Sequence, residues 1–136
     1  MRTAELVDSV RETMVRKVVT AGPQASLTTA ARLMVENKIG SIVILERGRI
    51  VGIITESDFM RFASAGCNME QSKVKDFMRR KVVSCEPSCR IVDAIMLMKK
   101  RRVRHLPIAT KTKRLLGIVS LRDLMAATQL TSIYLI

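Results

Sequence analysis

The chain has 136 residues, of which 48% are hydrophobic and 3% aromatic. This length accommodates one compact domain, or two small units that share a core, and it excludes a large multidomain enzyme. The 24 Lys and Arg residues against 12 Asp and Glu give a formal net charge of +12, which favours anionic partners such as nucleotide phosphates, nucleic acid or an acidic protein surface.

The first half of the chain predicts the element order β-α-β-β-α. Ser26 is a good N-cap for a helix whose apolar residues recur at helical spacing, and Gly40 is expected to end that helix. Two strands with an Arg-Gly-Arg turn between them then predict a β-hairpin. The expected elements are a strand at Val18-Val19, a helix from 27 to 39, strands at 41–45 and 50–54, and a helix from Glu56 to about Ala63.

The second half repeats the first. With an offset of 64, Val10-Arg-Glu-Thr-Met14 aligns with Val74-Lys-Asp-Phe-Met78. One extra residue in the turn at 109–114 moves the offset to 65, so that the stretch after Gly52 aligns with the stretch after Gly117. The repeat therefore predicts strands near Val82-Val83, 105–109 and 115–119, with helices near 90–100 and 121–129.

We therefore expect an α/β (α+β) fold of two β-α-β-β-α repeats packed with pseudo-two-fold symmetry. A unit of roughly 60 residues buries little surface alone, which favours packing of one repeat on the other. The expected boundaries are an N-terminal leader segment at 1–13, the first repeat at 14–66, a linker and second leader at 67–77, the second repeat at 78–130 and a C-terminal tail at 131–136.

The same short motif ends both repeats: Gly, two aliphatic residues, Thr or Ser, and Asp three residues later. In the simpler interpretation, Thr55 with Asp58 and Ser120 with Asp123 are capping boxes that satisfy helix N–H groups without a ligand. Alternatively, a hydroxyl and a carboxylate at a helix start receive the hydroxyls of a ribose. The preceding glycine would let a ligand or neighbouring backbone come close.

The tandem unit, the VRETM and VKDFM leaders and the doubled Gly-h-h-Thr/Ser-x-x-Asp endings, where h is an aliphatic residue, resemble a CBS-domain pair, or Bateman module. The resemblance covers nearly the whole chain. It implies a regulatory module that binds adenosine-containing ligands, such as AMP, ADP or ATP, in clefts between the repeats and transmits occupancy to an unknown partner protein. It also implies a disc-like homodimer. The nucleotide is then an effector, and no tightly bound cofactor is required.

Residue by residue, the resemblance implies that Asp58 and Asp123 hold ribose hydroxyls, with Thr55 and Ser120 beside them near ribose or phosphate. It assigns ligand phosphates to Arg104 and His105, which precede Leu-Pro, and the base largely to backbone groups after each first strand. The base-contacting residues are Val19, Thr20, Ala21, Val83, Ser84 and Cys85.

The two clefts are not expected to be equivalent. The first copy has Gly40-Ser41 where the second has Arg104-His105. A carboxylate at a helix start makes that end a poorer phosphate site than a bare N-terminus, so phosphates must find cations elsewhere. Arg104 offers a planar, permanent charge suited to phosphate oxygens. His105 is equally compatible with a packed strand residue whose ring bonds to backbone.

Two other classes of function stay open at this point. Basic segments at 79–81, 99–104 and 111–114 fit nucleic-acid binding through backbone phosphates. The chain has almost no aromatic surface for stacking, however, and no legible helix-turn-helix or zinc finger. Catalysis is less favoured, because the single His lies beside no convincing nucleophile, and we predict a protein that is not an enzyme.

Cys67, Cys85 and Cys89 are an odd number of cysteines without metal-ligand spacing, typical of small buried residues in a reducing compartment. No metal site is therefore predicted. No apolar run approaches the ~20 residues of a transmembrane helix, so we expect a soluble, cytoplasmic protein with no membrane contact. The apolar stretches at 130–136 and around Leu6, Val7 and Val10 either complete the core or form a homodimer contact.

Overall fold

The computed structural model describes residues 8–135, and for residues 129–135 it describes the backbone alone. Within these residues, four α-helices and two small sheets form an α+β fold. The chain divides into two compact units. We call Val18–Val82 the central unit, and we call the segment up to Lys17 together with the chain from Val83 onward the split unit.

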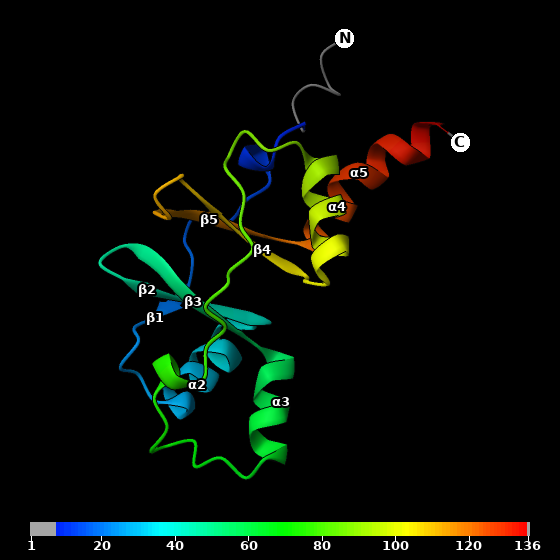
Figure 1. Cartoon of the computed structure of the whole chain (residues 1–136). Helices are drawn as coiled ribbons and strands as arrows, with labels where there is room; N and C mark the ends of the chain where they lie inside the picture. Colours follow the sequence, from blue (N-terminus) through cyan, green and yellow to red (C-terminus); the bar gives the residue numbers. More distant parts are fainter. Residues whose placement is uncertain (1–7, 136) are drawn as a thin grey trace. The chain divides into compact units, whose positions relative to one another are not determined.

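The central unit is a three-stranded sheet with helices on one face (Figure 1). Strand β1 (Thr20–Ala21) pairs parallel with β2 (Ser41–Glu46), which forms an antiparallel hairpin with β3 (Arg49–Thr55). The hairpin turn is Arg47-Gly48, with φ of 54° and 79°, as the two-residue turns that suit strand twist require. The other elements are α2 (Leu27–Asn37), α3 (Glu56–Ser64) and the 3₁₀ turn η2 (Val74–Asp76).

Helix α2 begins as predicted and ends earlier. The Ser26 hydroxyl accepts a hydrogen bond from the Thr29 N–H at 3.0 Å, which confirms the N-cap. The helix ends because Lys38 adopts a left-handed conformation with φ of 55°. Gly40 is therefore not the cap, and it lies just before β2.

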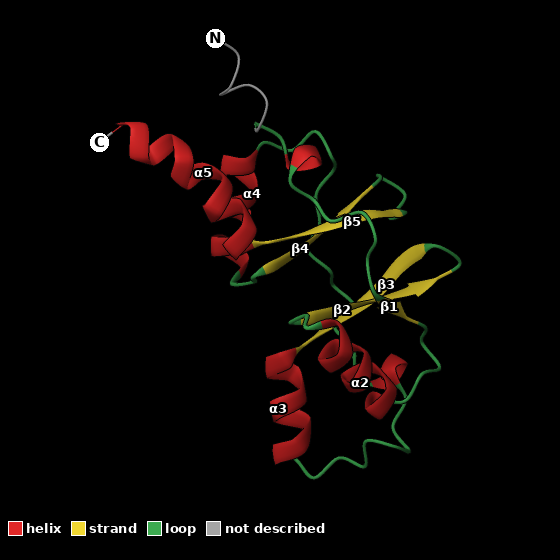
Figure 2. Ribbon diagram, turned by 180° about the vertical axis from the view of Figure 1, so that it is seen from behind, coloured by secondary structure: helices red, strands yellow, loops and turns green. Residues whose placement is uncertain are grey.

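The split unit repeats this arrangement with a two-stranded sheet. Strand β4 (His105–Ala109) pairs antiparallel with β5 (Leu115–Ser120). Helices α4 (Ile91–Arg101) and α5 (Leu121–Leu135) lie side by side, as Figure 2 shows from behind. The 3₁₀ turn η1 (Val10–Glu12) completes the unit.

The predicted strands at Val18-Val19 and Val82-Val83 are wrong. In the central unit β1 lies two residues later, where Thr20 pairs with Val43 and Ala21 with Ile44. In the split unit the equivalent of β1 is a single parallel bridge between Cys85 and Ile108. Pairing with the neighbouring strand, and not the β-propensity of two valines, decides where this short strand forms.

Each leader packs into the unit that contains the other repeat. Val10 and Met14 belong to the hydrophobic core of the split unit, while Val74 and Met78 belong to that of the central unit. The core of the split unit also contains Ile91, Ala94, Met98, Leu106, Ile108, Val119 and Leu124, and that of the central unit Leu27, Ala30, Met34, Ile42, Ile44, Ile54 and Phe62.

The motif glycines make room for these leaders. A Cβ atom on Gly52 would overlap the Met78 side chain, at 2.6 Å from its Cγ, and one on Gly117 would lie 2.8 Å from the Sδ of Met14. It would also lie 2.9 Å from the Val15 carbonyl oxygen. A neighbouring segment of the chain therefore occupies the space beside both glycines.

None of the helices in the described part of the chain is long and apolar enough to cross a membrane. Of the apolar residues near the chain ends, Val10 is fully buried in the split unit. The expected contacts of Leu6, Val7 and the side chains of 130–136 lie outside the described residues.

Candidate functional site

The sheet of the central unit carries the predicted site residues on β1 and at the end of β3. Because β1 runs parallel to β2 and β3 runs antiparallel, the starts of β1 and β2 lie at the same end as the last residue of β3. Ser41 pairs directly with Thr55, and Thr20 lies on the other side of β2. Thr55 therefore lies at this end, from which α3 starts, whereas Thr20 and Ala21 lie further along the sheet, level with Val43 and Ile44.

A complete capping box stands at the start of α3. The Asp58 carboxylate accepts a hydrogen bond from the Thr55 N–H at 2.9 Å, and the Thr55 hydroxyl accepts one from the Asp58 N–H at 3.4 Å. This is the structural interpretation that needs no ligand. Asp58 is only 1% exposed, so its carboxylate also needs further partners in the protein.

Two arginines supply those partners. The guanidinium of Arg79 donates to Asp58 Oδ1 from Nη2 at 2.8 Å and from Nε at 3.0 Å, and Arg61 forms a second ion pair from α3. Burial alone would raise the pKa of Asp58. Hydrogen bonds from Arg79 and the Thr55 backbone, with the Arg79 charge, outweigh burial and hold that pKa below its ordinary value. Asp58 is thus an ionised, buried anchor.

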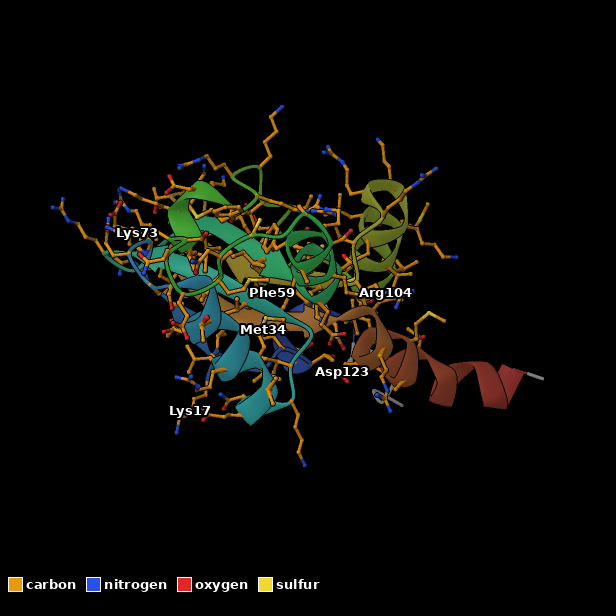
Figure 3. The ribbon with its side chains drawn as sticks, turned by 90° about the horizontal axis from the view of Figure 1, so that it is seen from below. Lys17, Met34, Phe59, Lys73, Arg104 and Asp123 are labelled. Carbon is orange, nitrogen blue, oxygen red and sulfur yellow. The ribbon has the colours of Figure 1, made fainter. Side chains whose placement is uncertain are left out.

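The split unit assembles the second set of predicted residues around the start of β4 and the end of β5. His105 pairs directly with Ser120, and the Arg104 carbonyl accepts a hydrogen bond from the Leu121 N–H at 2.8 Å. His105 is half-buried, whereas Arg104 and Asp123 are exposed; Figure 3 labels the latter two.

Asp123, the acid of this second set, has fewer protein partners than Asp58. The Ser120 hydroxyl accepts a hydrogen bond from the Asp123 N–H at 3.0 Å, which caps α5. The Asp123 carboxylate makes no hydrogen bond or ion pair with any residue that the structure describes. In particular, it accepts no hydrogen bond from the Ser120 N–H, so the capping box that is complete at α3 is incomplete here. Its oxygens are therefore open to solvent or to a ligand.

The backbone beside β4 is also partly unpaired. Cys85 donates its N–H to the Pro107 carbonyl at 3.2 Å and accepts from the Ala109 N–H at 2.9 Å. Among the described residues, the N–H and C=O groups of Val83 and Ser84 have no such partners. These groups are free to bond to the polar edge of a base.

Sequence reasoning missed Arg79, Arg61 and Ser41 as residues of these sites. The hydroxyl of Ser41, at the position of His105, is buried and has no hydrogen-bond partner within the described residues. A hollow of about 460 Å³ lies elsewhere, between α2 and α3, where Met34 and Phe59 line it (Figure 3). None of the predicted ligand-binding residues lines this hollow.

The CBS domain family matches this chain twice, at residues 8–65 and 74–129. The CBS domain-containing protein YhcV of Bacillus subtilis is 34% identical over 118 residues, which cover 87% of this chain and 84% of that protein. A homoserine O-acetyltransferase of Methanococcoides burtonii is 33% identical over 117 residues, which cover 85% of this chain and 23% of that enzyme.

Solved structures share the fold. A CBS-domain-containing protein from Agrobacterium tumefaciens is 31% identical with a TM-score of 0.81, covering 90% of this chain and 94% of that one. A CBS-domain pair in complex with 5′-methylthioadenosine and S-adenosyl-L-methionine has a TM-score of 0.84 at 21% identity, covering 92% of this chain and 98% of that one. The two family matches fill most of the sequence, and both units have the expected elements. The chain therefore belongs to the CBS-domain family, as a tandem pair of these regulatory modules.

Proposed function

We propose that this chain binds an adenosine nucleotide, namely AMP, ADP, ATP or a related compound, and transmits its occupancy to a partner protein. The observation that carries the proposal is the exposed Asp123 carboxylate, which has no partner among the described residues, at the start of α5. It lies in the same unit as the exposed Arg104 and the unpaired backbone of Val83 and Ser84.

These groups match the three parts of a nucleotide. A carboxylate accepts hydrogen bonds from the two ribose hydroxyls. An arginine binds phosphate oxygens through its planar fork, and unpaired backbone groups bond to the edge of the base. Support also comes from the related fold in complex with 5′-methylthioadenosine and S-adenosyl-L-methionine, because both ligands contain adenosine. A further fold relative is described as a putative archaeal homologue of the γ subunit of AMPK.

The test is calorimetric titration of protein that has been stripped of bound ligand by unfolding and refolding. We expect heat from at least one of AMP, ADP and ATP, and much weaker binding of GMP. Asp123→Asn should weaken that binding, and Asp123→Glu should recover part of it. Titrations without heat for all three adenosine nucleotides would contradict the proposal. Mass spectrometry of the denatured protein before stripping would identify a nucleotide that co-purifies.

We also propose a homodimer. Val35 on α2 is 77% exposed and Met60 on α3 is 74% exposed, which is a large apolar exposure for helices that flank a hollow. Light scattering coupled to size-exclusion chromatography tests this proposal. Val35→Glu with Met60→Glu should shift a dimer to a monomer without loss of thermal stability. A monomeric wild type at high concentration would contradict it.

We further infer that the chain is a cytoplasmic regulator and not an enzyme. Burial and the neighbouring Cys89 raise the pKa of the Cys85 thiol, which is the opposite of what a nucleophilic cysteine requires. Incubation with ATP should therefore leave the nucleotide intact, as measured by ion-exchange chromatography. Turnover above that of a control preparation of Asp123→Asn would contradict this inference.

A further inference from the structure

The two Asp residues occupy equivalent backbone positions with different surroundings. In the central unit, Arg79 and Ile53 exchange two backbone hydrogen bonds, both of 3.0 Å. In the split unit, Val15 and Ile118 exchange the same two bonds, at 2.9 and 3.0 Å. Val15 is therefore the structural counterpart of Arg79, as it is in the alignment of the repeats.

The cations beside Asp58 have no counterpart beside Asp123. Arg79 is replaced by Val15, and Arg61, three residues after Asp58 on α3, is replaced by Ala126, three residues after Asp123 on α5. Both replacements are exposed. The central unit thus clamps its acid with two guanidinium groups, whereas the split unit leaves its acid open.

The clamp occupies the atoms that a ribose would use. Both Asp58 oxygens already accept hydrogen bonds, Oδ1 from Arg79 and Arg61, and Oδ2 from the Thr55 N–H and the Arg79 Nε. Two neutral ribose hydroxyls could take this place only by displacing a cation from a carboxylate that is 1% exposed. Displacing these half-exposed arginines would leave a buried carboxylate without its ion-pair partners, which is unfavourable, and hydroxyls do not restore the lost charge.

We propose that the chain binds a single adenosine nucleotide, on the split unit through Asp123, because Arg79 and Arg61 close the equivalent position on the central unit. This inference rests on the proposed function and assigns which of its two positions is used. Val15 and Ala126 then keep the position beside Asp123 open to the nucleotide. Arg79 and Arg61 limit binding to one nucleotide per chain.

Exchange of these four residues between the central and split units tests the inference. Calorimetry with AMP and with ATP on the stripped wild type should give one site per chain. Val15→Arg with Ala126→Arg transplants the clamp to exposed positions and should weaken binding by about tenfold or more, since a charge-assisted hydrogen bond to the acid is lost. Arg79→Val with Arg61→Ala gives the central unit the residues of the split unit and should add a second site.

The controls separate the clamp from net charge and from folding. Arg80→Val with Lys81→Ala removes two neighbouring exposed cations, and it should leave one site with unchanged affinity. Thermal unfolding checks each variant, and Arg79→Gln is the milder alternative if the double variant does not fold. Two sites on the wild type, or binding that survives Asp123→Asn and is lost in Asp58→Asn, would overturn this inference alone. Absence of heat for AMP and ATP in every variant would overturn the proposed function and the inference with it.

Discussion

The Arg79 guanidinium holds both carboxylate oxygens of Asp58, with Nε at 3.0 Å from Oδ1 and 3.2 Å from Oδ2. Arg79 follows the second leader, and Asp58 lies in the first turn of α3. Because the pair joins segments 21 residues apart, it fastens the leader to the helix start as well as neutralising a buried charge. The fold of the central unit therefore depends on the carboxylate that the sequence predicts to bind a ribose.

This pair predicts a loss of stability in acid. The folded-state pKa of Asp58 lies below its ordinary value of 3.8, because Arg79 and the Thr55 backbone outweigh the effect of burial. The stabilisation is fully present above the unfolded-state pKa and is lost as the pH falls through the folded-state pKa. Urea unfolding from pH 7 to pH 2 should show a smaller acid-dependent decrease for Asp58→Asn than for the wild type. Asp123→Asn, at an exposed carboxylate, should keep the wild-type profile; equal profiles for Asp58→Asn and the wild type would contradict the prediction.

The surroundings of Gly52 and Gly117 predict that a second substitution restores stability more fully in one unit than in the other. Gly52→Ala and Gly117→Ala should each lower the free energy of unfolding by about 1–3 kcal/mol, since the added Cβ meets a leader in a packed interior. Met78→Ala should restore part of the loss in Gly52→Ala, because the nearest atoms there all belong to the Met78 side chain. Met14→Ala should restore less in Gly117→Ala, because the Val15 carbonyl oxygen remains 2.9 Å from the new Cβ. Equal rescue in both units, measured by chemical unfolding, would contradict this account.

Two serines predict opposite effects of the same substitution. The Ser41 hydroxyl is buried without a partner among the described residues, so Ser41→Ala should raise the free energy of unfolding by about 1 kcal/mol. The Ser26 hydroxyl caps α2 by accepting from the Thr29 N–H, so Ser26→Ala should lower it by about 1 kcal/mol. Urea unfolding at pH 7 measures both changes. A destabilised Ser41→Ala would show that the hydroxyl has a partner, such as a bound water.

Much of the fold follows from the sequence because the repeat supplies each element twice. The hairpins, both helices of each repeat and the Ser26 cap were predicted from local patterns that act within a few residues. The crossing of the leaders was not, because the attachment of Met14 beside Gly117 depends on packing across about a hundred residues. Such contacts leave no periodic signal in the sequence.

The candidate site was predicted as a set of equivalent residues, and its asymmetry was only partly foreseen. Sequence comparison of the repeats identified the loss of the basic pair at Gly40-Ser41. The same alignment also places Arg79 opposite Val15, yet a lone arginine after a leader does not reveal that it reaches Asp58. The two arginines without a counterpart in the alignment, Arg61 and Arg79, lie in the unit whose acid is buried, and this difference between the repeats is visible in the sequence.

The exposed position of Arg104 predicts that its side chain contributes to the affinity for ATP but not for adenosine. Its side chain is exposed at the start of β4, next to the strand pair that joins His105 to Ser120. If the nucleotide binds through Asp123, loss of one charge-assisted hydrogen bond should cost ATP about 1.5–3 kcal/mol, or roughly tenfold to a hundredfold in affinity.

Adenosine lacks phosphate, so Arg104→Ala should leave its affinity unchanged in the same calorimetric titration. Lys111→Ala removes an equally exposed cation from the turn at the opposite end of the β4–β5 hairpin, and it should change neither affinity. Equal weakening of ATP and adenosine by Arg104→Ala would show that the arginine supports the fold of the site and does not contact phosphate. Weakening of ATP by Lys111→Ala to the same extent would show that net charge attracts the nucleotide, because a general electrostatic effect does not distinguish the two ends of the hairpin.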